Sequence, residues 1–282
     1  MAEKKKTAAN RALDTGTLLG LALAVGGICG GLLLEGGTLR EIAQPTAAII
    51  VLGGTIGATM LGQPFPVFLG ACRQLAQVIF VIRADAAEGV RQIVEFAMKA
   101  RKNGIVSLEK EVMAIPDPFL KKALTLAVDG TEPQEIRRMM ELESGIEESR
   151  REAEARVLEA AGGYAPTIGI IGAVLGLIQV MKHLENIEEV GKGIAVAFVA
   201  TIYGVGVANL LLLPAAAKIK AKAQAQSRLR ELTLEGVIGI AEGLNPKLIQ
   251  GKLEAYLEKR PEAAKPAPKP APAAAGESAS TA

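Results

Sequence analysis

Few side chains in this sequence have the type and spacing that a metal site or a catalytic site requires. Its 282 residues include one histidine, His183, and two cysteines, Cys29 and Cys72. One histidine cannot form a multi-histidine metal site, and no nucleophile–base arrangement can be drawn around it. Neither cysteine belongs to a cluster with metal-ligand spacing, and no phosphate-binding glycine motif follows a predicted strand. We therefore predict no catalytic residue, no metal site, no cofactor and no enzymatic activity.

The remaining polar candidates lie inside long apolar runs of the chain. In the last two of these runs they are Thr167, Gln179, Thr201, Tyr203 and Asn209. A protein that moves ions normally has ionisable groups within the membrane, yet the apolar runs contain no Asp, Glu, Lys, Arg or His. Either this chain moves no ions, or another subunit supplies the titrating group.

Two prolines also lie within the last two of these runs. Pro166 is near the start of the third run and Pro214 is near the end of the fourth. Each removes a backbone hydrogen bond and can kink its helix. The alternative is a proline at a helix end with no mechanical role, and spacing alone does not separate the two.

Four charge-free runs position these residues. About 20 apolar residues cross a bilayer as a helix, and four such runs are hard to bury in one soluble domain. The first run is too long and too glycine-rich for a cleaved signal peptide, so we expect it to be retained. Small residues at four-residue spacing, such as Gly172 and Gly176, favour close helix packing in lipid. The runs are Thr15–Leu34, Ile42–Cys72, Ala160–Met181 and Gly193–Ala217.

The charged segments set the orientation and the domain plan. Lys and Arg gather before the first run, between the second and third, and after the fourth, which predicts that both termini are cytoplasmic. We predict an all-α polytopic membrane protein with a large helical cytoplasmic domain between helices 2 and 3. The net charge of +2 gives no indication of a nucleic-acid partner. The predicted parts are a disordered basic N-terminus (1–13), membrane helices 1 and 2 (14–66), a cytoplasmic domain (67–159), membrane helices 3 and 4 (160–217), C-terminal cytoplasmic helices (218–260) and a disordered Pro/Ala tail (261–282).

Local patterns predict the cytoplasmic helices. Apolar and charged residues mix at helical spacing from Val67 to Lys102, which predicts one long helix leaving the membrane, with Gly104 as its stop. Shorter helices are expected over Leu108–Met113 and Phe119–Val128. Pro133 then opens a helix that runs toward the third span, and a last amphipathic helix follows Pro246.

Several stretches resemble the family of flagellar motor stator A-subunits (MotA, with PomA and MotP as relatives). In the membrane they include "GGYAPTIGIIGAVLGLIQVMKHL" and "GIAVAFVATIYGVGVANLLLLPAAAKI", and in the cytoplasmic segment "MKARKNGIVSLEKEV". The resemblance runs from Asp14 to Leu257, and the order and spacing of its motifs are highly specific. It implies a multi-pass protein of the bacterial inner membrane.

The resemblance also implies partners. Several A-subunits, five in this family, surround two copies of a B-subunit (MotB), whose single span supplies an essential Asp. Ion binding to that Asp and release from it would turn the ring of A-subunits against the rotor protein FliG. The other partners are membrane lipids.

Residue roles follow from matching positions. Pro166 and Pro214 match two prolines that couple ion flow to movement, and Thr201 matches a threonine lining the ion path. Arg101 and Glu109 match a charged pair that meets complementary charges on FliG. Glu143 aligns, less securely, with a further acidic position ahead of the third span.

The coupling ion is predicted to be the proton. Sodium-type relatives tend to have a threonine seven residues after the proline of the third span, and often another just before the threonine of the fourth. This sequence has Ala173 and Ala200 there. Two missing hydroxyls remove oxygen ligands that a hard cation would use, whereas a carboxylate needs none of them to bind a proton.

Two alternatives stay open at this stage. An ExbB/TolQ-like energiser of an envelope system also surrounds partner helices, but it has three spans and a differently placed cytoplasmic domain. A non-conducting membrane scaffold is a different class, and the chain alone does not exclude it because the ion-binding group is absent from it.

Overall fold

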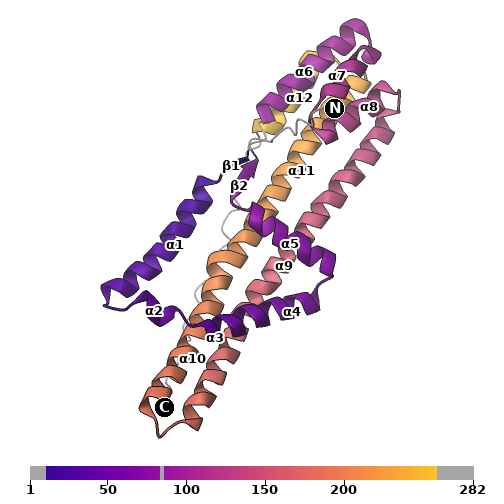
Figure 1. Cartoon of the computed structure of the whole chain (residues 1–282). Coiled ribbons are helices and arrows are strands. Elements are labelled where there is room, and N and C mark those ends of the chain that lie inside the picture. The colour runs from indigo at the N-terminus through magenta and orange to yellow at the C-terminus, as the bar shows by residue number, and fades with distance from the viewer. Residues whose placement is uncertain (1–10, 83–85, 259–282) are drawn as a thin grey trace, which may run out of the picture.

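Two long helical rods run the length of the molecule, side by side (Figure 1). The computed structural model describes residues 11–82 and 86–258. One rod is α9 (Pro133–Lys182), which Pro133 opens at its first turn, a position where the missing N–H is not needed. The second rod returns antiparallel as α10 (Ile187–Val207), the π-helical turn η3 (Ala208–Leu212) and α11 (Leu213–Ala241).

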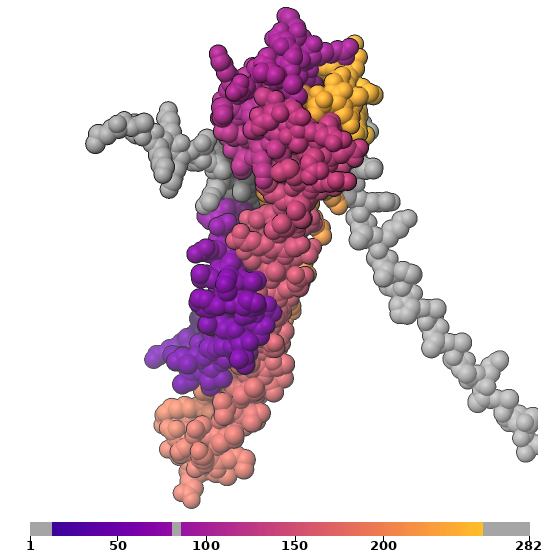
Figure 2. All heavy atoms as spheres, turned by 90° about the vertical axis from the view of Figure 1, so that its right-hand side faces the viewer, coloured from indigo at the N-terminus to yellow at the C-terminus, as the bar shows by residue number. Residues whose placement is uncertain are grey.

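The N-terminal elements lie against one side of these rods, below the broader head (Figure 2). Within residues 11–82 and 86–258, four helices are long and apolar enough to cross a membrane: Thr15–Leu34, Pro45–Gly62, and the apolar parts of α9 and of the returning rod. The predicted fold class is thereby confirmed. The N-terminal helices are α1 (Thr15–Leu34), α2 (Leu39–Ile42), α3 (Pro45–Ala48), the π-helical turn η1 (Ile49–Gly53), α4 (Gly54–Gly62) and α5 (Phe65–Gln77).

A globular head covers the charged ends of both rods. Its apolar core combines segments that are far apart in the sequence, with Ile93, Leu124, Met140, Val237 and Leu253 all at most 1% exposed. Large apolar side chains are removed from water here, which is the main stabilising contribution in a cytoplasmic domain. The head contains α6 (Ala86–Asn103), the 3-10 turn η2 (Ile105–Leu108), α7 (Glu109–Ala114), α8 (Pro118–Val128) and α12 (Pro246–Glu258), with the charged ends of α9 and α11.

One predicted helix is wrong. The segment from Val67 to Lys102 is not a single helix, because α5 ends at Gln77 and a short strand, β2 (Phe80–Ile82), precedes α6. Helical spacing is a local signal, and it could not show that a distant segment supplies a strand partner here.

That partner comes from the N-terminus. β1 (Arg11–Leu13) pairs antiparallel with β2, so that Ala12 lies opposite Val81. The end of the segment predicted as disordered (1–13) is therefore ordered in the structure, and a two-stranded ribbon accompanies the helices. The first ten residues and the tail (261–282) lie outside the described residues.

Other local predictions agree with the structure. α6 ends before Gly104, which has a φ of 81° and so a backbone conformation that favours glycine. α8 covers the predicted segment Phe119–Val128. In α9, Arg151 pairs with Glu147 at 2.9 Å.

Candidate functional site

The membrane parts of α9 and α10 are in backbone-to-backbone contact. A Cβ added to Gly169 would lie 2.9 Å from the carbonyl oxygen of Ala200, and one added to Gly176 would lie 2.8 Å from that of Gly193. A Cβ at Gly204 would lie 2.5 Å from the carbonyl oxygen of Ala165. In lipid, where the hydrophobic effect does not draw helices together, such close approach gives the packing energy.

Thr201 lies in this contact. A Cβ at Gly169 would come within 3.5 Å of the Thr201 Cα, so the threonine backbone packs on α9. Its hydroxyl donates to the Ala197 carbonyl at 3.3 Å, and the side chain is half-buried. In this bond the hydroxyl is the donor, so its oxygen can still accept.

Ala173 directly follows Gly172, which forms the next close contact of α9 with α10. Its neighbour Gly172 approaches the Ala200 methyl, since an added Cβ there would be 2.8 Å from the Ala200 Cβ. Of the two alanines at which the sequence lacks sodium-type hydroxyls, Ala200 thus lies in the α9–α10 contact, and Ala173 adjoins the glycine that packs on it. Ala200 is fully buried, and Ala173 is half-buried.

The two predicted prolines flank one helix crossing. Pro166 lies inside α9 without ending it, and its missing N–H removes the bond to the Gly162 carbonyl. A Cβ at Gly162 would be 2.6 Å from a methyl of Leu213, the residue before Pro214. The structure therefore brings the two weakened backbone positions to the same level of the two rods.

A π-helical turn adjoins the second proline. η3 (Ala208–Leu212) separates α10 from α11 immediately before Leu213 and Pro214. Such turns are uncommon and occur frequently at functional positions. No sequence signal predicted η3, because a wider turn leaves the pattern of apolar residues unchanged.

Tyr203 has a structural role that sequence reasoning did not identify. Its hydroxyl donates to the Ile42 carbonyl at 2.6 Å, and the Gln44 amide donates to that hydroxyl at 3.4 Å. This bond fixes α10 to the start of the second span.

The turn between α6 and α7, beside which Arg101 and Glu109 lie in the sequence, is at the end of the head that points away from the membrane helices (Figure 1). Arg101 and Glu109 are both exposed, and no ion pair to either is found among residues 11–82 and 86–258. Nearby, Lys99 pairs with Glu111 at 2.7 Å and fixes α6 to α7. Val106 between them is 65% exposed. Within the described ranges, this tip therefore presents Arg101 and Glu109 without an ion pair, beside the equally exposed Lys102 and Lys110 and an exposed apolar side chain.

Glu143 differs from these two charges. It forms an ion pair with Lys122 of α8, so its charge already has a partner within the head. The structure does not bring it into contact with Arg101 or Glu109.

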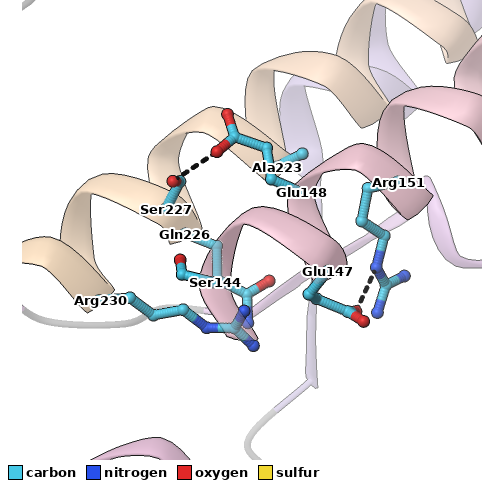
Figure 3. Close-up of a pocket in the computed structure, with 8 residues that line it drawn as sticks. All are labelled: Ser144, Glu147, Glu148, Arg151, Ala223, Gln226, Ser227 and Arg230. Atoms are coloured by element: carbon cyan, nitrogen blue, oxygen red, sulfur yellow. Dashed lines mark hydrogen bonds and ion pairs between the residues drawn. The ribbon is translucent and has the colours of Figure 1, made fainter. Parts of the chain in front are cut away.

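Polar contacts tie the two rods together between the membrane part and the head (Figure 3). Ser227 of α11 donates to Glu148 of α9 at 2.7 Å. Arg230 of α11 lies over the ring of Phe119 of α8, with its guanidinium carbon 5.3 Å from the ring centre, and so connects this rod to the head. Lys220 of α11 bonds Glu159 of α9 at 2.7 Å. The rods are therefore cross-linked along this stretch.

A buried ion-pair network fixes the rods to the rest of the head. Glu235 of α11 is 8% exposed and bonds Arg137 of α9, with a closest distance of 2.6 Å, and Lys252 of α12 at 2.5 Å. Burial alone would raise the pKa of the Glu235 carboxyl, but the two hydrogen bonds outweigh it and lower that pKa. The same pair raises the pKa of Arg137, chiefly through its hydrogen bond to Glu235.

Comparison with known proteins identifies the same family as the sequence motifs did, and it does so over most of the chain. Residues 18–104 match the family described as motility protein A N-terminal, and residues 111–232 match the MotA/TolQ/ExbB proton channel family. The chain is 36% identical to motility protein A of Bacillus subtilis (strain 168) over 247 residues, which cover 87% of this chain and 91% of that protein. It is 31% identical to chemotaxis protein PomA of Vibrio alginolyticus over 248 residues, 88% of this chain and 96% of PomA.

Solved structures agree with the fold described above. The structure of C. jejuni MotAB superposes with a TM-score of 0.83 at 32% identity, covering 88% of this chain and 98% of that one. The flagellar MotAB stator complex from Bacillus subtilis gives a TM-score of 0.80 at 36% identity, covering 86% and 96%.

Proposed function

This chain belongs to the MotA/TolQ/ExbB proton channel family, in its motility protein A branch, and we propose that it is the A-subunit of a flagellar motor stator. With a MotB-type partner it would form an ion channel in the inner membrane and convert ion flow into torque on the rotor. The match of residues 18–104 to the motility protein A N-terminal family favours this function over an ExbB/TolQ-like energiser.

One observation carries the proposal. The same two rods contain the glycine-lined contact around Thr201 and end in the head whose tip bears Arg101 and Glu109. Pro133 and Pro166 are separated by 33 residues of unbroken helix, roughly 50 Å at 1.5 Å per residue. A change of angle at the membrane prolines would therefore be carried to the tip as a larger displacement.

The partner supplies what this chain lacks. Solved relatives are complexes of MotA with MotB, and the apolar runs here contain no acid or base. We propose that a B-subunit brings the intramembrane Asp, that Thr201 lines its path, and that several copies of this chain, five by family resemblance, surround a B dimer. In this arrangement both termini are cytoplasmic.

Arg101 and Glu109 are proposed to contact the rotor protein FliG. Free charges at an exposed tip steer and orient a partner with complementary charges. Glu143 is the weaker candidate, because Lys122 already neutralises it.

Co-expression with the B-subunit in cells without their own stator tests the proposal. The wild-type chain should restore rotation, and Arg101→Glu and Glu109→Lys should each lower torque strongly while the complex still reaches the membrane. Arg91→Glu is the matched control, because Arg91 lies on the same helix, is exposed and pairs only locally with Glu88. Unchanged swimming with both reversals would refute the rotor contact, and absence of rotation with the wild-type chain would refute the function.

The ion is tested separately. Ala173 and Ala200 favour the proton. Rotation should stop with a proton uncoupler and be unaffected by removal of external sodium. Rotation that follows sodium and survives the uncoupler would refute the choice of ion and leave the stator assignment intact.

A further inference from the structure

α1 is the span that the rest of the chain holds least. None of its residues is buried, although it is 20 residues long. α9 and α10, by contrast, share a continuous glycine contact. Within a single copy of the chain, α1 approaches the returning rod at η3, and the side-chain hydrogen bonds that join it to that rod lie at its start.

Its cytoplasmic end is firmly attached. Asp14 caps the helix by accepting from the Thr17 amide at 3.2 Å, and its own amide donates to the Ile79 carbonyl at 2.8 Å. The preceding residues pair with β2 as strand β1. The start of α1 and the end of α5 thus form one unit.

Two lysines of α11 attach this unit to the rod. Lys218 donates to the Asp14 carboxylate and to the Thr17 hydroxyl. One turn later, Lys222 donates to the carbonyls of Val78 at 3.0 Å and Phe80 at 2.7 Å. We call Asp14, Thr17, Lys218, Lys222 and residues 78–80 the junction.

The charges of the junction are set by their contacts. The hydrogen bond from Lys218 lowers the pKa of Asp14 to about 2, although partial burial opposes the shift. Burial lowers the pKa of Lys222. The Asp14 carboxyl therefore enters this contact in its charged form.

The junction lies next to the position at which α11 can bend. Lys218 is four residues after Pro214, which is one helical turn on the cytoplasmic side of the weakened backbone position. A rotation of α11 about Pro214 therefore displaces Lys218 with the rod, and Lys218 is hydrogen-bonded to Asp14 and Thr17 at the start of α1.

We propose that Lys218 is a positioning residue that makes α1 move together with the α11 rod just beyond Pro214. This inference rests on the proposed stator function. Without the bond, Lys222 would still hold residues 78–80, but α1 itself would lose its side-chain hydrogen bonds to the rod. A turn of α11 at Pro214 would then leave α1 behind, and part of the movement would deform the junction instead of reaching the head.

The test compares three variants in the assembled complex with its B-subunit. Lys218→Met keeps the apolar stem and removes the donor, Asp14→Asn keeps an N-cap and removes the charge, and the third variant combines both. Each should assemble and conduct ions like the wild type, while torque per stator falls at least roughly twofold. The double variant should lose no more than either single one, because the two groups act as a pair.

Two controls separate positioning from general damage. Lys218→Arg keeps a cation that can reach Asp14 and should retain torque. Lys220→Met removes a lysine of the same helix that bonds Glu159 of α9 instead of α1, and it should not give the same loss of torque with conduction preserved.

Three outcomes would overturn the proposal: normal torque with both single variants, additive losses in the double variant, or equal loss of conduction and torque. Failure of the wild-type chain to support rotation would instead refute the stator function, so the two hypotheses fail in different ways.

Discussion

The membrane part and the head of this protein are held together in opposite ways. In the membrane, Gly169, Gly176 and Gly204 bring two backbones into direct contact. In the head, large side chains such as Leu124 and Met140 fill a core with 0% exposure. Lipid offers no hydrophobic gain for burying a leucine against another helix, so the membrane part gains stability from close approach. Water offers that gain, so the head buries large apolar surface.

This difference in packing predicts which substitutions each part tolerates. A backbone cannot move aside for a new atom, whereas a side chain can adopt another rotamer. The membrane contact should therefore be sensitive to added atoms, and the head to removed atoms.

Leu124→Ala should have the largest effect. It removes a fully buried side chain and should destabilise the head by about 3 kcal/mol. Hydrogen exchange of the purified complex in urea measures this, and lost protection should be confined to the head. Leu142→Ala is the control, because Leu142 is 66% exposed on the cytoplasmic part of α9. Equal losses for both would contradict the view that the core carries the stability.

Gly204→Ala tests the membrane contact. The new Cβ would lie 2.5 Å from the Ala165 carbonyl oxygen, and separating the helices should cost about 2 kcal/mol. Thermal unfolding in detergent and the amount of assembled complex report it. Gly206→Ala, whose Cβ would have nothing within 4 Å, should behave like the wild type. If the two variants behave alike, the contrast between the two regions is not real.

Glu235→Gln tests the ionic network of the head. Among the described residues, the membrane contact between α9 and α10 contains no comparable ion pair. The folded pKa of Glu235 is depressed, so its contribution is fully present above the pKa of the unfolded chain, about 4.3 for glutamate. It is lost as the pH falls through the lower folded value. The wild-type head should therefore lose stability in this acid range, and the variant should start lower and change less. Urea midpoints between pH 3 and pH 7 would measure both, and identical pH profiles would contradict the role of the network.

Gly236→Ala should have the smallest effect. Its Cβ would meet the Ile93 Cγ2 methyl at 2.5 Å, a side-chain atom that can shift. The strain should roughly cancel the gain of about 1 kcal/mol from replacing a helical glycine. A loss as large as that of Gly204→Ala, measured by the same thermal unfolding, would show that the type of neighbouring atom does not matter.

Much of the fold was readable from local signals. The four spans followed from apolar length, and the ends of α6 and α9 from Gly104 and Pro133, because these depend on residues within one or two turns. The family resemblance identified Thr201, Pro166, Pro214, Arg101 and Glu109 as candidates, and their proposed roles await the experiments above.

The parts that were not predicted all depend on residues far apart in the chain. β1 meets β2 across some 70 residues, and Lys218 reaches Asp14 across 204. The sequence suggested a cytoplasmic domain (67–159) separate from the C-terminal helices (218–260), but the structure packs α6, α8, α11 and α12 around one core.

By itself, the sequence determined that four apolar helices cross a membrane and that this chain brings no acid of its own to them. Apolar length and the cost of burying a charge in lipid are properties of composition and order along the chain. Only the tertiary structure decided that both prolines lie at one crossing, that Glu143 is already paired, and that α1 is attached to α11. Those choices depend on which distant surfaces pack together, and a one-dimensional pattern does not contain that information.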